Sequence, residues 1–174
     1  MRRLPVLLAV LALAGAAPGL ALAQTPPPAT PAPKGVTVTD VGTWLTSLGG
    51  SVAEPETAPG VQILRVADQP LPWSLTFFAC ETLCDDVQYA AIFTGPITEA
   101  QTTAWNREHR YLKAVFHPSE TPGGAATVVA QYDLILTSTG TEQLQEPTYS
   151  WLQLLRAFDQ ALRAAVPAPA PPAQ

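Results

Sequence analysis

Residues 104–114 bring together side chains that could do chemistry. They include three basic residues, one of the chain's two histidines and the adjacent pair Trp105 and Asn106. Basic side chains beside an imidazole could bind an anion. In an extended strand, however, Arg110 and Lys113 point to opposite faces, because side chains alternate and a spacing of three is odd. A shared anion site would therefore need a bulge in that strand.

The same segment lies where a helix is expected to give way to a strand. Trp105 falls on the helix, where its ring would pack the helix against the sheet. Asn106 is the only asparagine, and its amide could cap the helix end or bridge the turn. We interpret both residues as structural, with a ligand contact as the alternative for Asn106. Arg110 could bind a ligand or pair with Glu108 or Asp133, worth about 0–1 kcal/mol at an exposed site.

Cys80 and Cys84 are the only cysteines in the chain. In an exported protein the pair is expected to form a disulfide, because an oxidising compartment favours pairing. For so short a loop, the chain-entropy estimate of its stabilisation is roughly 2 kcal/mol. The alternatives are a redox-active pair and free or metal-bound thiols. The C-x-x-x-C spacing differs from that of thioredoxin-like sites, and neighbouring carboxylates disfavour a thiolate.

No catalytic, cofactor or metal site is predicted. His109 and His117 are eight residues apart, roughly 26 Å along an extended strand, so they could share an ion only across a sharp bend. The three acidic residues around the cysteines could hold calcium, but carboxylates at the tip of a loop are usually only solvated. The sequence contains no G-x-S-x-G nucleophile elbow, and its Gly123-Gly124 pair indicates a turn rather than a phosphate-binding loop.

Hydrophobic periodicity predicts the elements that position these residues. A first helix is expected after a cap at Thr39, with one apolar face that consists of Val41, Trp44, Leu45 and Leu48. A polar loop then runs to Gly60. Three strands follow over 61–66, 73–80 and 87–93, and their short links predict an antiparallel meander.

The second half of the domain continues with a helix, two strands and a helix. Thr98 and Gln101 form a capping-box pattern for a helix that reaches about Glu108. Strands are predicted over 110–116 and 127–136. Pro147 suits the first turn of a last helix, whose apolar stripe consists of Trp151, Leu154, Leu155, Phe158, Ala161 and Leu162. The order α-β-β-β-α-β-β-α predicts an α+β domain with a five-stranded antiparallel sheet and helices on one face.

Both ends of the chain differ in composition from the middle. Arg2 and Arg3 precede a short apolar run and an A-x-A pattern that ends at Ala23, which predicts a cleaved signal peptide and a periplasmic or secreted protein. An uncleaved N-terminal anchor is the alternative. The predicted segments are a signal peptide, a disordered Pro/Ala-rich linker, an α+β domain and a disordered Pro/Ala-rich tail, over 1–23, 24–35, 36–166 and 167–174.

Charge excludes several classes of partner. The chain has nine basic and 14 acidic residues. Without Arg2 and Arg3, seven basic residues face the same 14 acidic ones, a net charge of about −7. An acidic chain without a basic run is a poor ligand for nucleic acid and for anionic membrane surfaces. No later segment is apolar over the roughly 20 residues that a membrane span needs.

The spacing of five residues and the order of the elements together indicate a family. The five residues are Trp105, Asn106, Arg110, Tyr111 and Ala114. With the order of elements over about 38–165, they resemble the YbjN family, whose domain is similar in fold to type III secretion chaperones. Exported members are similar in having a cysteine pair before the third strand. Many members have an acidic residue after the alanine, whereas 116–118 here reads Phe-His-Pro. The resemblance implies a fold and a class, and no reaction.

The leading hypothesis is an exported, non-enzymatic interaction module. Its partner would be a protein or peptide, bound at an exposed sheet edge or in a helix groove. A homodimer is expected by analogy with the chaperone fold. The alternative is a small-ligand binding protein, with a pocket between the sheet and the last helix lined by Tyr111, Trp151 and Phe158. An enzyme is a third hypothesis.

Overall fold

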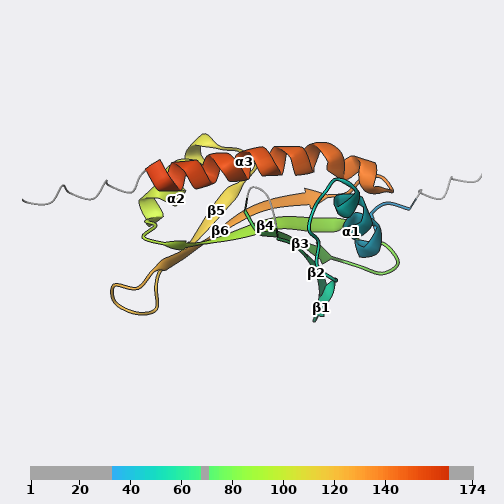
Figure 1. Ribbon diagram of the computed structural model, residues 1–174, viewed down its shortest axis with the longest axis horizontal. Coiled ribbons are helices and arrows are strands. Elements are labelled where there is room, and N and C mark those ends of the chain that lie inside the picture. Colours follow the sequence, from blue (N-terminus) through green and yellow to red (C-terminus); the bar gives the residue numbers. More distant parts are fainter. Residues whose placement is uncertain (1–32, 68–70, 165–174) are drawn as a thin grey trace, which may run out of the picture. The chain divides into compact units, whose positions relative to one another are not determined.

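A single antiparallel sheet with the spatial order β1-β2-β3-β4-β6-β5 organises the fold (Figure 1). The computed structural model describes residues 33–67 and 71–164, which belong to one compact unit. The strands are β1 Glu56–Ala58, β2 Val61–Val66, β3 Trp73–Phe78, β4 Asp86–Gly95, β5 Lys113–His117 and β6 Ala126–Ile135. The helices are α1 Val38–Ser47, α2 Glu99–Glu108 and α3 Gln145–Ala164, with a 3-10 turn, η1 Thr141–Leu144, directly before α3.

The predicted α+β class and antiparallel sheet are confirmed, but the sheet has six strands in the described region, not five. The additional strand is β1, in the expected polar loop. It pairs with β2 through Glu56 opposite Ile63 and Ala58 opposite Val61, around a turn where Gly60 adopts a φ of +78°. Hydrophobic periodicity could not detect this strand, because it is three residues long and buries none of them.

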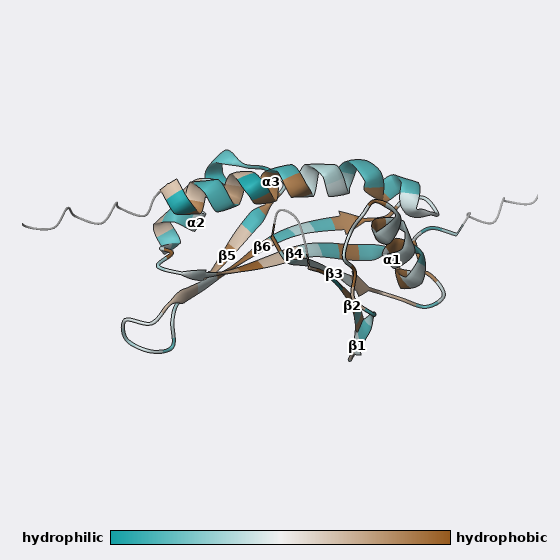
Figure 2. Ribbon diagram, in the orientation of Figure 1, coloured by the Kyte–Doolittle hydropathy of each residue, from teal (hydrophilic) through white to brown (hydrophobic). Residues whose placement is uncertain are grey.

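Alternation along the strands builds the core on one face of the sheet. Every second residue of β3 is buried, from Trp73 to Phe77, and the buried residues of β4 and β6 continue the same layer. Figure 1 shows α1, α2 and α3 on this side of the sheet. The predicted stripe of α3 is confirmed in its four main members, Trp151, Leu155, Phe158 and Leu162, and Figure 2 shows polar and apolar bands alternating along this helix.

Helix α1 begins two residues earlier than predicted. Its cap is Thr37, not Thr39, and the Thr37 hydroxyl accepts a hydrogen bond of 3.0 Å from the Asp40 amide. The buried face therefore starts at Val38, and Leu48 lies beyond the last helical turn with 64% of its surface exposed. The capping box of α2 is confirmed, with Thr98 and Gln101 bonded reciprocally.

The predicted signal peptide, most of the predicted linker and the predicted tail lie outside the described residues. Pro33, Lys34 and Gly35, in the predicted linker, contact the domain: Lys34 pairs with Asp85 at 3.0 Å, and the Gly35 amide donates to the Ser138 carbonyl at 2.8 Å. Among the helices that the structure describes, none has the length and apolar character needed to cross a membrane.

Candidate functional site

Trp105 and Asn106 fasten α2 to the outer side of β5, the last strand of the sheet. Trp105 is buried, and its indole N–H donates to the Leu112 carbonyl at 3.0 Å. The Asn106 amide donates to the Ala114 carbonyl and accepts from the Ala114 N–H, both at 2.8 Å. One side chain thus bonds both backbone groups of an edge residue, as a neighbouring strand would.

The charged end of this segment is also engaged with backbone. Lys113 donates to the carbonyls of Asn106, at 2.9 Å, and of His109, a favourable place for a cation because the carbonyl end of a helix carries partial negative charge. His109 stacks on Trp105 with ring centroids 3.4 Å apart. These contacts engage Lys113 and His109, two of the groups that could have bound an anion.

Arg110 and Tyr111 do not join this cluster. The prediction that they lie in a strand is wrong, because β5 begins at Lys113 and the chain needs residues 109–112 to cross from α2 to the sheet. Arg110 is exposed and forms none of the ion pairs found among the described residues. Of the five residues behind the family resemblance, Trp105, Asn106 and Ala114 meet at one place. Tyr111 is 60% exposed and lies against Tyr132, with ring centroids 6.1 Å apart.

Cys80 and Cys84 form a disulfide in the loop between β3 and β4. This loop holds the segment that precedes α1: the Val36 amide donates to the Cys84 carbonyl at 3.0 Å, and the Cys84 amide donates to the Val36 carbonyl at 2.8 Å. Cys84 is buried in the core cluster. The disulfide therefore stabilises the loop that holds the segment before α1.

A groove with apolar walls lies between the end of α1 and the beginning of α3. Its volume is about 690 Å³. Its apolar walls are formed by Trp44, Leu48, Tyr149 and Leu152. Trp44 and Leu152 are half-buried, whereas Leu48 is as exposed as noted above and Tyr149 is 65% exposed. Large apolar side chains that stay open to solvent beside a hollow are typical of an interaction surface.

The charged residues that line this groove are Glu142 and Glu146. The same two glutamates line a second hollow on the other side of the η1–α3 segment, of about 510 Å³, which also contains Tyr111 and Tyr132. Burial raises the pKa of Tyr132, and the nearby Tyr111 and Glu146 raise it further. Both hollows therefore have a negative electrostatic character.

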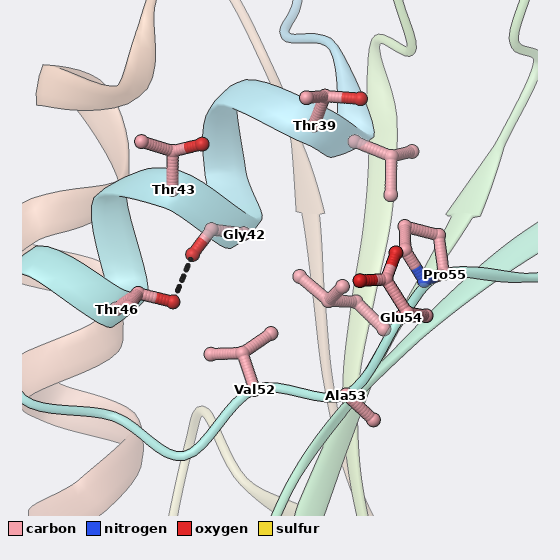
Figure 3. Close-up of a pocket in the computed structure, with 10 residues that line it drawn as sticks. Thr39, Gly42, Thr43, Thr46, Val52, Ala53, Glu54 and Pro55 are labelled. Carbon is pink, nitrogen blue, oxygen red and sulfur yellow. Dashed lines mark hydrogen bonds between the residues drawn. The ribbon is translucent and has the colours of Figure 1, made fainter.

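A third hollow lies between α1 and the segment that leads to β1 (Figure 3). Its volume is about 370 Å³, and Figure 3 shows Thr39, Thr43 and Thr46 along the helical wall, with Glu54 and Pro55 on the other wall. The Thr46 hydroxyl already donates to the Gly42 carbonyl at 2.9 Å. With a smaller volume and no aromatic ring, this hollow offers less apolar surface to a ligand than the groove does.

The predicted ligand pocket lined by Tyr111, Trp151 and Phe158 does not form from those residues. Trp151 and Phe158 are fully buried, and aromatic neighbours fill the space under α3. Tyr89 lies 5.8 Å from Trp151, and Phe93 lies 5.1 Å from Phe158, between ring centroids. Only Tyr111 borders a hollow, the one that it shares with Tyr132.

Within residues 33–67 and 71–164, no three potential ligands from among histidine, cysteine and the acids lie close enough together to hold a metal ion. His117 is exposed on β5, while His109 is stacked on Trp105.

Comparisons with protein-family models, curated proteins and solved structures found no match. The candidate site therefore depends on geometry alone.

Sequence analysis missed most of the groove. Leu48 was assigned to the buried face of the first helix, and Tyr149, Leu152, Glu142 and Glu146 were not singled out. The available signal was Tyr149, a large aromatic residue that does not fall on the predicted stripe of the last helix. Its position off the stripe places it outside the core.

Proposed function

We propose that this protein is a non-enzymatic interaction module that binds a peptide segment of a partner protein in the groove between α1 and α3. The observation that carries the proposal is the apolar wall of this groove, where Leu48 and Tyr149 are about two-thirds exposed beside the half-buried Trp44 and Leu152. An apolar groove between helices is a recurrent way to bind an amphipathic peptide.

The charge of the groove specifies the chemistry of the partner. Its charged lining residues are both glutamates, so a peptide with apolar side chains and at least one lysine or arginine is complementary to it. An acidic peptide would be repelled by the same carboxylates.

The lining also favours binding over catalysis. The groove is lined by no histidine, cysteine or lysine, and Glu142 or Glu146 could serve as a base only for a nucleophile within hydrogen-bond reach. The hydroxyl of Thr148, the one hydroxyl there apart from the phenol of Tyr149, lies 2.8 Å from the Tyr89 hydroxyl in a buried hydrogen bond.

The family and the cellular location belong to the same proposal. We propose that the chain is of the YbjN type with a chaperone-like fold, on the residue spacing and element order given above. The Cys80–Cys84 disulfide supports an oxidising compartment, as expected for a protein exported by the predicted signal peptide.

Selection from a random peptide display library on the immobilised, oxidised protein tests the proposal. We expect enrichment of peptides that combine apolar and basic residues. The variants Leu48→Gln and Tyr149→Gln should reduce binding of the selected peptides at least tenfold, because each removes apolar contact area without adding charge.

The control is Ile135→Gln, at a residue of β6 that is 70% exposed on the face of the sheet without helices. It should bind the selected peptides as the wild-type protein does. Failure to enrich any peptide, or equal losses in Ile135→Gln and the groove variants, would contradict the proposal. Sedimentation of the unliganded protein tests whether a second copy of the chain occupies the groove instead. A dimer that the groove variants abolish would contradict peptide binding as the role of the groove.

A further inference from the structure

The hollow that contains Tyr111 and Tyr132 has the composition of a site for an organic cation. The two rings are tilted by 55° with centroids 6.1 Å apart, and Glu142, Glu146, Pro147 and Ser150 continue the lining. Tyr111 is largely exposed and Tyr132 is half-buried. One ring is therefore fixed in the domain, while the other is open to a ligand.

Two kinds of group in this hollow attract positive charge. The face of an aromatic ring carries negative charge density and binds ammonium or guanidinium groups within about 6 Å of its centroid. Carboxylates add a direct attraction, and none of the lining residues is basic. Glu146 and Tyr132 line the same hollow; burial raises the pKa of the Tyr132 phenol most, and Tyr111 and Glu146 raise it further.

A purely structural account explains only part of this arrangement. Glu146 lies in the first turn of α3, where a carboxylate stabilises a helix through the partial positive charge of its N-terminus. That role requires no aromatic partner. It leaves unexplained why Tyr111, which directly follows the exposed Arg110, places its ring against Tyr132 beside these carboxylates.

The hollow also adjoins the proposed peptide groove. Glu142 and Glu146 line both, so the two hollows flank the same stretch of η1 and α3. A peptide that crosses this stretch could place an apolar side chain against Leu48 and Tyr149 and a basic side chain beside Tyr111.

We propose that the hollow formed by Tyr111, Tyr132 and Glu146 binds the guanidinium or ammonium group of an arginine or lysine side chain in the peptide. The inference rests on the proposed function for the source of that side chain. The hollow can nevertheless be tested without a peptide, because its chemistry requires only the cation.

The first experiment uses N-acetyl-arginine amide and its neutral isostere N-acetyl-citrulline amide as probes of the oxidised protein. NMR spectra of the tyrosine rings report binding directly. We expect the arginine probe to shift the Tyr111 and Tyr132 ring signals, and the citrulline probe to shift neither. Equal shifts with both probes, or none with arginine at tens of millimolar, would overturn the inference.

Variants locate the site. Tyr111→Leu removes the ring and Glu146→Gln removes the charge, and each should weaken the arginine probe by about two- to fivefold. Glu120→Gln, an exposed charge in the loop between β5 and β6, is the matched control and should have no effect. A similar loss in Glu120→Gln would mean that only the overall negative charge attracts the probe, which contradicts a defined site.

The two proposals fail separately. Leu48→Gln disrupts the groove and should leave binding of the arginine probe unchanged. If the hollow binds arginine but no peptide is selected, the proposed function is wrong and the cation site remains. If selected peptides bind the groove but tolerate replacement of their arginine by citrulline, the hollow is not part of recognition and this inference is wrong.

Discussion

The side chain of Asn106 replaces a neighbouring strand at the outer side of β5. Its amide bonds both the N–H and the C=O of Ala114, while Trp105 bonds the Leu112 carbonyl. Unpaired edge groups invite pairing with another chain, so these two residues protect the edge as well as attach the helix. Much of the segment that resembled a binding site therefore forms bonds within the protein, and the β5 edge is covered at Ala114.

Replacing Asn106 should therefore destabilise the domain and open the edge. We expect Asn106→Ala to lower the free energy of unfolding by about 1–3 kcal/mol, because two hydrogen bonds to a partly buried backbone are lost. Asn106→Asp can still accept from the Ala114 N–H, but its second carboxylate oxygen would face the Ala114 carbonyl in place of the amide donor, so it should not restore wild-type stability. Urea unfolding measures both, with the exposed Gln153→Ala as the control. Equal stability of Asn106→Ala and the control would contradict the role of the amide.

Tyr89 gives the protein a predictable response to alkaline pH. Burial raises the pKa of its phenol, and the hydrogen bond with Thr148 opposes this only in part. Because the unfolded phenol titrates near pH 10, the contribution of Tyr89 to stability is complete below about pH 10 and is lost as the pH rises toward the folded pKa. Between about pH 9.5 and 11.5, thermal unfolding should show a smaller loss of stability in Tyr89→Phe than in wild type.

The matched control for this measurement is the exposed Tyr149→Phe, which should keep the wild-type slope. Tyr89→Phe should also be less stable near pH 8, by about 1 kcal/mol, through loss of the bond with Thr148. A wild-type slope in Tyr89→Phe would show that Tyr89 titrates normally in the folded protein.

At the scale of elements, residues 33–36 connect three parts of the fold. Gly35 and Val36 bond to Ser138 on one side and to Cys84 on the other, and the Gly140 amide donates to the Gly35 carbonyl at 3.2 Å. The disulfide loop, the segment before η1 and the start of α1 are therefore held together through this short piece of chain.

Loss of the disulfide should loosen this connection. The double variant Cys80→Ser, Cys84→Ser should lose roughly 2 kcal/mol of stability by the chain-entropy estimate. Hydrogen exchange of the Val36 amide, which donates to the Cys84 carbonyl, should accelerate more than that of amides in α3. Uniform acceleration across the domain would mean that the disulfide stabilises the fold without a particular effect on residues 33–36.

Gly35 and Gly49 form a matched pair that separates backbone strain from close packing. Both have a positive φ, +108° and +92°, so alanine costs about 1–2 kcal/mol at either position. A Cβ on Gly35 would also lie 2.5 Å from the Cys84 carbonyl oxygen, whereas a Cβ on Gly49 would meet nothing within 4 Å. Gly35→Ala should therefore be clearly less stable than Gly49→Ala in urea unfolding, and equal losses would contradict this close contact.

At the scale of the whole domain, much of the fold could be predicted because amphipathic periodicity is a local property. The strand over 61–66, the capping box at Thr98 and the stripe of α3 needed only local patterns of sequence. Strand β1 could not be predicted because it has no apolar signal. The start of β5 could not be predicted because it depends on how Trp105 and Asn106 bond to residues seven and eight positions later.

The groove between α1 and α3 could not be predicted for a different reason. It forms where Trp44 and Leu48, at the end of the apolar face of α1, approach Tyr149 and Leu152, which lie outside the main stripe of α3. No periodicity within either helix encodes that approach. The same holds for the hollow at Tyr111, which depends on residues from the α2–β5 connection, β6, η1 and α3. Sequence analysis therefore predicted a sheet edge or a helix groove as the class of site, whereas the residues of the groove required the fold.

Binding at this groove is the central claim, and chemical-shift mapping tests it most directly. The ¹⁵N-labelled domain, with its disulfide intact, would be titrated with a peptide selected against the wild-type protein. We predict that the largest amide shifts fall on the end of α1 around Trp44 and Leu48 and on the beginning of α3 around Glu146 and Tyr149, with little change at Ile92 and Ile135. Shifts centred on those two isoleucines of the helix-free sheet face, or no saturable shifts, would contradict the account.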